Sequence, residues 1–177
     1  MDTTLPQQTN KKGWLNIGWK LMTAYGVFFI LLSILVPLFS YFSLPNQPMM
    51  TFAGGDEKFI GLSWSQIMSA SPNLGLWIVL TMISMCAMMM GLGILILAIA
   101  IRPYRQGERW AWKALLFATL IPIFAHYLFI SFIHWLHGLP IWTLAPGSSG
   151  VGADSINFIV LVWLYFGLWL PRKELKD

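Results

Sequence analysis

The stretch LGLWIVLTMISMCAMMMGLGILILAIAI, residues 74–101, contains no charged side chain. A helix of about 20 apolar residues crosses a hydrocarbon layer about 30 Å thick. Three further apolar blocks lie at residues 19–42, 110–135 and 155–170. Backbone groups in lipid must be hydrogen-bonded within the protein, and these blocks lack the alternating pattern of barrel strands. The sequence therefore predicts four transmembrane helices.

The composition supports this interpretation. Of the 177 residues, 57% are hydrophobic and 10% are charged, whereas charged residues make up about 25% of an ordinary soluble domain. The chain is also too short for two domains of ordinary size, so we expect a single integral membrane domain over residues 1–177. A single cysteine, Cys86, excludes an intrachain disulfide and a cysteine-based metal cluster within one chain.

The positive charges predict the orientation of the bundle. All but one of the 11 Lys and Arg residues lie before or at the start of the first block, surround the turn between the second and third blocks, or follow the fourth; the exception is Lys58. The positive-inside rule makes the basic side cytoplasmic. We expect an all-α, four-transmembrane-helix bundle with both termini in the cytoplasm. Because the basic residues flank apolar blocks instead of forming one stripe, they argue against nucleic acid binding.

A cleaved signal peptide is the alternative interpretation of the first block, since Lys11, Lys12 and Lys20 resemble its basic start. The apolar stretch after Lys20 is longer than the about 7 to 15 residues of a typical signal core. It also ends at residues 41–45 without a small-residue cleavage site. We therefore expect a membrane span.

Two segments connect the blocks on the opposite, outer side. In the lid loop, residues 44–73, Ser63 and Gln66 have the spacing of a capping box and predict a short helix from Trp64 to about Ala70. That helix would lie on the bilayer surface or cover the bundle, as a shield for helix ends or as a gate for a ligand. Residues 137–154 contain a glycine-rich run, which we interpret as a connector because no Lys-Ser or Lys-Thr follows it.

The distribution of carboxylates limits the chemistry. All seven Asp and Glu residues lie outside the four blocks. This argues against a proton-coupled carrier working through a membrane carboxylate, a di-iron bundle and a paired-carboxylate hydrolase.

His126 is the histidine that lies well inside a block, about 16 Å beyond Leu115, near which we take the hydrocarbon core to begin. Pro122 precedes it by one turn and predicts a kink there. The imidazole could bond to a neighbouring helix, contact a quinone, lipid headgroup or other small ligand, or ligate haem; the last would need a second histidine, which a homodimer could supply. Trp64 and Tyr127 complete the candidate ligand-binding residues. The hydroxyl groups available to His126 on other blocks belong to Thr23, Tyr25, Ser33, Thr81 and Ser84.

His134 and His137 are near the outer interface and are too few for a metal site, so we expect no metal and no cofactor.

The second block is rich in methionine, with Ala87 and Gly91 at a small-xxx-small spacing and Gly93 nearby. Such residues allow helices to approach closely in lipid. Most tryptophans fall near block ends, as an aromatic belt requires.

The turn at residues 102–112, RPYRQGERWAW, is the most motif-like segment. Gly107 permits a tight reversal, Glu108 suits the positive start of the third helix, and Arg102, Arg105 and Arg109 can contact Glu108, helix carbonyls or anionic lipid. Together with the sequence GLSW at residues 61–64 and Pro72, this turn resembles a family of small uncharacterised bacterial four-helix membrane proteins. The resemblance implies a multi-pass protein of the bacterial inner membrane and no particular activity.

From these features we expect a non-catalytic accessory subunit or a lipid- or hydrophobe-binding bundle. Its expected partners are the lipid bilayer and either another membrane protein or further copies of the chain. The alternative is a membrane enzyme or carrier for a hydrophobic small molecule, with His126 inside the bundle and Trp64 on the gate.

Overall fold

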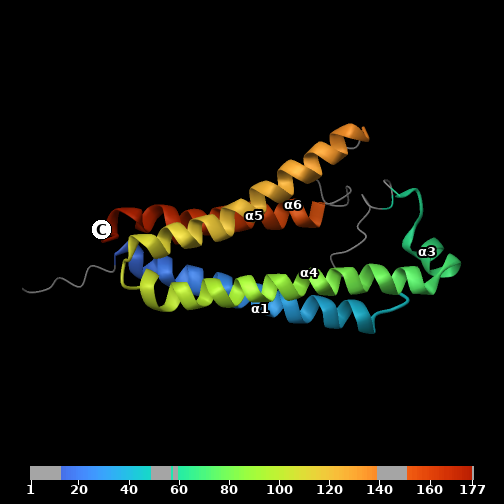
Figure 1. Cartoon of the computed structure of the whole chain (residues 1–177), viewed down its shortest axis with the longest axis horizontal. Coiled ribbons are helices and arrows are strands. Elements are labelled where there is room, and N and C mark those ends of the chain that lie inside the picture. The colour runs from blue at the N-terminus through green and yellow to red at the C-terminus, as the bar shows by residue number, and fades with distance from the viewer. Residues whose placement is uncertain (1–12, 49–56, 58–59, 139–150, 177) are drawn as a thin grey trace, which may run out of the picture.

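The computed structural model describes residues 13–48, 57, 60–138 and 151–176 (Figure 1). Every element in these ranges is helical and none is a strand, so the all-α prediction is confirmed. The elements are α1 (Trp14–Phe42), α3 (Trp64–Ala70), α4 (Pro72–Ile99), the π-helical turn η1 (Ala100–Tyr104), α5 (Arg109–Leu136), α6 (Val151–Leu164), the π-helical turn η2 (Tyr165–Trp169) and the 3₁₀ turn η3 (Leu170–Glu174).

Two of these helices are long and apolar enough to cross a membrane. They are α1, with 29 residues, and the continuous helix Pro72–Tyr104, with 33 residues, and 18-residue stretches within them have mean hydropathies of 2.3 and 2.4. They coincide with the first two apolar blocks of the sequence.

Helices α1 and α4 lie side by side, and two glycines bring their backbones into contact (Figure 1). A Cβ atom on Gly26 would lie 3.0 Å from the carbonyl oxygen of Gly93, and one on Gly93 would lie 3.0 Å from that of Gly26. Gly91 faces away from this contact between α1 and α4, since a Cβ there would meet no atom within 4 Å. Ala87 is also exposed. The expected close packing is therefore present, but it involves Gly93 and not the Ala87–Gly91 pair.

The buried apolar side chains form two separate clusters. The inner cluster joins α1, α4, η1, α5, α6 and η2, and the outer cluster joins α1, α3 and α4. The inner cluster contains Met22, Tyr25, Ile96, Ala100, Tyr104, Ala111, Leu115, Val160, Leu164 and Leu168. The outer cluster contains Val36, Trp64, Ile67, Val79, Met82 and Cys86.

Large apolar side chains cover the outward faces of the helices. Exposed fractions reach 78% at Phe42, 77% at Met88 and 69% at Leu128. Water-soluble monomers rarely expose contiguous apolar patches of more than a few hundred square ångströms.

Helix α5 differs from the others in its course. It follows the bundle in its first half and runs away from α4 in its second half (Figure 1). Pro122 lies inside this helix, and a proline removes a backbone hydrogen bond there. Beyond it, Ile123 still packs against the inner cluster, whereas Phe124, Phe129, Phe132 and Trp135 are exposed.

Candidate functional site: the charged end of the bundle

The beginning of α1, the turn between α4 and α5, and the C-terminal turns meet at one end of the molecule (Figure 1). We call this region, residues 13–20, 102–113 and 165–176, the charged end. The sequence-based grouping of cations is therefore present in the part of the chain that the structure describes. The cations are Lys20, Arg102, Arg105, Arg109, Lys113, Arg172, Lys173 and Lys176.

A carboxylate from the C-terminal segment caps the first helix. The backbone N–H groups of Trp14 and Leu15 donate to the two carboxylate oxygens of Glu174 at 2.8 and 2.9 Å. The N-cap residue Gly13 has no side chain to do this. An anionic group at a helix N-terminus satisfies free N–H groups and interacts favourably with the helix dipole. Glu174 thus links the two ends of the described chain.

The turn after η1 is closed by Gly107, as the sequence predicts, because its φ of 83° is the left-handed conformation that glycine adopts readily. The carbonyl of Gly107 accepts a hydrogen bond from the backbone N–H of Lys176 at 2.8 Å. This bond joins the turn to the C-terminal segment.

Aromatic side chains link the helices at this end by donating to backbone carbonyls. The hydroxyl of Tyr104 donates to the carbonyl of Gly167 at 2.6 Å. Pro171 lies four residues after Gly167 and has no N–H, so this carbonyl lacks its ordinary helical donor. The indole N–H of Trp112 donates to the carbonyl of Leu168 at 2.8 Å, and that of Trp163 to the carbonyl of Leu21 at 3.0 Å.

Two arginines stack on tryptophan rings. The guanidinium carbon of Arg105 lies 4.9 Å from the ring centre of Trp19, and that of Arg172 lies 3.9 Å from the ring centre of Trp169. Such cation–π contacts restrict the arginine side chains without neutralising them. Glu108 accepts a hydrogen bond from the indole of Trp110, a contact that the sequence does not predict.

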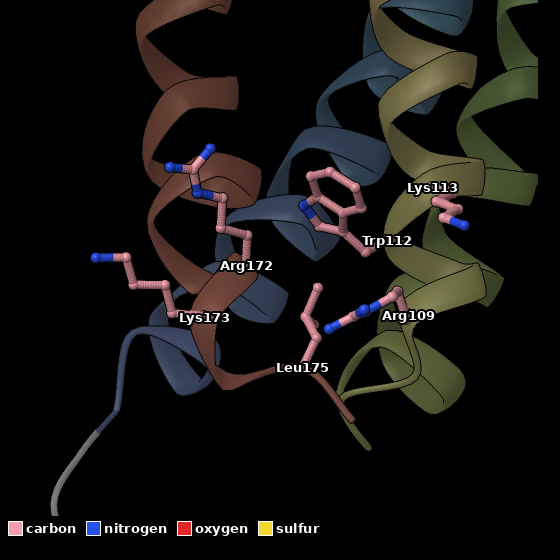
Figure 2. Close-up of a pocket in the computed structure, with 6 residues that line it drawn as sticks. All are labelled: Arg109, Trp112, Lys113, Arg172, Lys173 and Leu175. Atoms are coloured by element: carbon pink, nitrogen blue, oxygen red, sulfur yellow. The ribbon is translucent and has the colours of Figure 1, made fainter. Parts of the chain in front are cut away.

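A cavity of about 440 Å³ opens at the charged end between the start of α5 and the C-terminal segment (Figure 2). Its lining consists of Arg109, Trp112 and Lys113 from α5 with Arg172, Lys173 and Leu175. Figure 2 shows Arg109 pointing toward Leu175, with Lys113 and Lys173 on opposite sides of the cavity.

Of the four turn residues predicted to contact lipid, Arg109 lines the cavity, whereas Arg102, Arg105 and Glu108 do not. In the sequence, Lys113, Arg172 and Lys173 contribute only to the predicted orientation in the membrane. Their proximity to Arg109 depends on the packing of the C-terminal segment against α5.

Trp64 is a packing residue of the lid helix. It is 4% exposed, and its indole N–H donates to the carbonyl of Pro45 at 2.8 Å. The predicted capping box of α3 is confirmed: Ser63 and Gln66 exchange side-chain and backbone hydrogen bonds at both positions. The helix covers α1 and α4 through the outer cluster.

His126 and Tyr127 lie in α5, but their side chains are outside the described residues. Several hydroxyl groups expected to serve His126 are bonded within their own helices. Ser33 donates to the carbonyl of Phe29, Thr81 to that of Trp77, and Ser84 to that of Leu80. The ligand-binding role of His126, Trp64 and Tyr127 stays a prediction.

Among the described residues, no group of three or more His, Cys, Asp and Glu side chains could hold a metal ion. No protein-family model, curated protein or solved structure matches the chain.

Proposed function

We propose that this chain is a non-catalytic, lipid-binding bundle of four transmembrane helices, with both termini in the cytoplasm of a bacterium and the helices in its inner membrane. The observation that carries the proposal is the exposed apolar surface. This apolar surface covers the long helices, and the cations are clustered at one end of them. Lipid makes such a surface favourable, while interfacial Lys and Arg can contact phosphates.

The lengths of the other two helical segments support four spans. Helix α5 has 28 residues, about 42 Å at the rise of an α-helix. Residues 151–174 form a continuous helical segment through α6, η2 and η3. Both exceed the about 20 residues that a span requires. The resemblance of the 102–112 turn to small bacterial membrane proteins agrees with this proposal.

Extraction and topology tests check the proposal directly. The full chain should stay in the membrane pellet after alkaline carbonate treatment. A green fluorescent protein fused after residue 177 should be fluorescent, and alkaline phosphatase at the same position should be inactive. Both reporters should give the opposite result when placed after residue 47 in a chain truncated there. Release by carbonate, or an active phosphatase after residue 177, would contradict the proposal.

A second candidate function, an accessory subunit, is favoured by the outer half of α5. Its exposed aromatic side chains lie where the helix runs away from α4 (Figure 1). Phe and Trp side chains on such a face are suited to packing against a helix of another protein in the membrane. Native mass spectrometry of gently extracted protein distinguishes the two candidates. A defined heteromeric mass supports the subunit, and a chain carrying only lipid supports the lipid-binding bundle.

A further inference from the structure

We propose that the cavity between α5 and the C-terminal segment binds a phosphate group, supplied by the headgroup of an anionic phospholipid. This inference rests on the proposed membrane location and specifies the lipid chemistry that the bundle recognises. The cavity lining holds four cations, Arg109, Lys113, Arg172 and Lys173.

The charge around the cavity favours an anion. No carboxylate is among its lining residues as the structure describes them. The two described acids at this end, Glu174 and Glu108, contact the α1 backbone and the Trp110 indole and are not among the lining residues. Several cations of one sign around a partly enclosed space raise the local potential for anions.

The geometry of the lining suits phosphate. The cations belong to both sides of the cavity: Arg109 and Lys113 lie on α5, and Arg172 and Lys173 lie on η3 (Figure 2). A guanidinium group offers paired N–H donors that match phosphate oxygens, and a long lysine side chain can reach in from the rim. The stacking of Arg172 on Trp169 limits its rotamers before a ligand binds. The indole N–H of Trp112 donates to the carbonyl of Leu168, and the Trp112 side chain forms part of the cavity wall.

The side chains next to the cavity indicate a lipid as the source of the phosphate. Phe117 lies one helical turn from Lys113 on the same face of α5, and Trp169 lies one turn from Arg172. Both residues lie on the membrane side of the cations along their helices in the proposed topology, and their side chains are 58% and 47% exposed. A phospholipid could thus place its phosphate among the cations and its acyl chains against these rings. The cavity volume of about 440 Å³ is ample for the headgroup.

Native mass spectrometry with the purified full chain in detergent tests the assignment. The chain is titrated with phosphatidylglycerol, with phosphatidylcholine of the same acyl chains, and with phosphatidylglycerol in the presence of inorganic phosphate. We expect one phosphatidylglycerol to bind preferentially. Neutralising one lining cation, in Arg172→Gln or Lys173→Gln, should weaken that binding about fivefold, and the double variant about 25-fold.

Lys20→Gln is the matched control, because Lys20 is an exposed cation of the charged end that does not line the cavity. It should change binding less than twofold. Preferential phosphatidylglycerol binding that depends on Arg172 and Lys173 supports the lipid site. Competition by inorganic phosphate, with no preference for phosphatidylglycerol over phosphatidylcholine, supports the phosphate site and assigns its ligand to a soluble source.

Equal binding by the wild-type chain and the double variant overturns the inference. The carbonate extraction described above separates this failure from that of the proposed function. A chain that stays in the membrane but shows no cation-dependent binding refutes only the phosphate site, whereas a chain released by carbonate refutes the membrane location itself.

Discussion

The charged end and the lid end of this molecule hold their helices together in different ways. At the charged end, side chains donate to backbone carbonyls of other helices, as Tyr104 does to Gly167 and Trp112 to Leu168. At the lid end, α3 is fixed by burial of Trp64 and Ile67, by its own capping box, and by the bond from the Trp64 indole to the carbonyl of Pro45 in the turn directly after α1. The charged end therefore joins distant parts of the chain, while the lid end adds a local cover to α1 and α4.

The two regions should therefore respond differently when one of their contacts is removed. Loss of a link at the charged end affects the packing of α1, α5 and the C-terminal turns together. Loss of the lid should open the outer cluster and leave the inner cluster intact, because the two clusters share no buried residue.

The largest effect is expected at the contact between α1 and α4 formed by Gly26 and Gly93, because both regions include these two helices. Gly93→Leu places a side chain against the α1 backbone, where a Cβ alone would lie 3.0 Å from the carbonyl oxygen of Gly26. Overpacking typically costs about 1–3 kcal/mol when flexible side chains can adjust, and here backbone must move. We expect little monodisperse protein by size-exclusion chromatography. Gly91→Leu is the control and should behave as wild type. An equal loss of monodisperse protein in both variants would contradict a specific close contact at Gly93.

The next largest effect should be confined to the lid. Trp64→Ala removes a buried ring, a change that typically costs about 3–5 kcal/mol where the ring is part of a core. Cys86 belongs to the same cluster and serves as a natural reporter. A membrane-permeant maleimide should label Cys86 several-fold faster in this variant, with the thermal midpoint of the whole bundle little changed. An unchanged labelling rate would show that the lid does not protect the outer cluster.

A smaller but global effect is expected at the charged end. Tyr104→Phe leaves the buried carbonyl of Gly167 without its donor, at a cost of about 1–3 kcal/mol. The thermal midpoint should fall while the labelling rate of Cys86 at low temperature stays at the wild-type value. Tyr165→Phe removes a hydroxyl from an exposed tyrosine nearby and should have no effect. If both variants melt alike, the link through Tyr104 contributes nothing.

The smallest effect concerns the cap of α1. Glu174→Ala leaves the N–H groups of Trp14 and Leu15 without their carboxylate, and loss of a helix cap costs about 1 kcal/mol. Hydrogen exchange should become faster in the first turn of α1 and stay unchanged in α4. Glu108→Ala removes the other described carboxylate of this end and should leave exchange in α1 as it is; acceleration in that variant as well would argue against a specific cap.

The parts of the fold that depend on local sequence could be predicted. The apolar blocks marked the long helices, Ser63 and Gln66 marked the start of α3, and Gly107 marked the turn. Each of these signals lies within a few residues of the structure it specifies.

The contacts between distant segments could not be predicted in the same way. The spacing of Ala87 and Gly91 does not reveal which face of α4 meets α1, and the structure places Gly93 there instead. Likewise, the cations at residues 172 and 173 predicted only an orientation, because nothing local indicates that they approach Arg109 and Lys113. The role of Glu174 required knowing that the C-terminal turns pack against the beginning of α1.

The cap supplied by Glu174 also has a consequence for biosynthesis. Helix α1 is made first, yet the carboxylate that satisfies its first N–H groups is added 160 residues after Trp14. During translation the beginning of α1 must therefore bond to water, lipid headgroups or the insertion machinery. The charged end closes only after residue 174 has left the ribosome, so the final fold of α1 is tied to synthesis of the later helices α3 to α6 and the C-terminal turns.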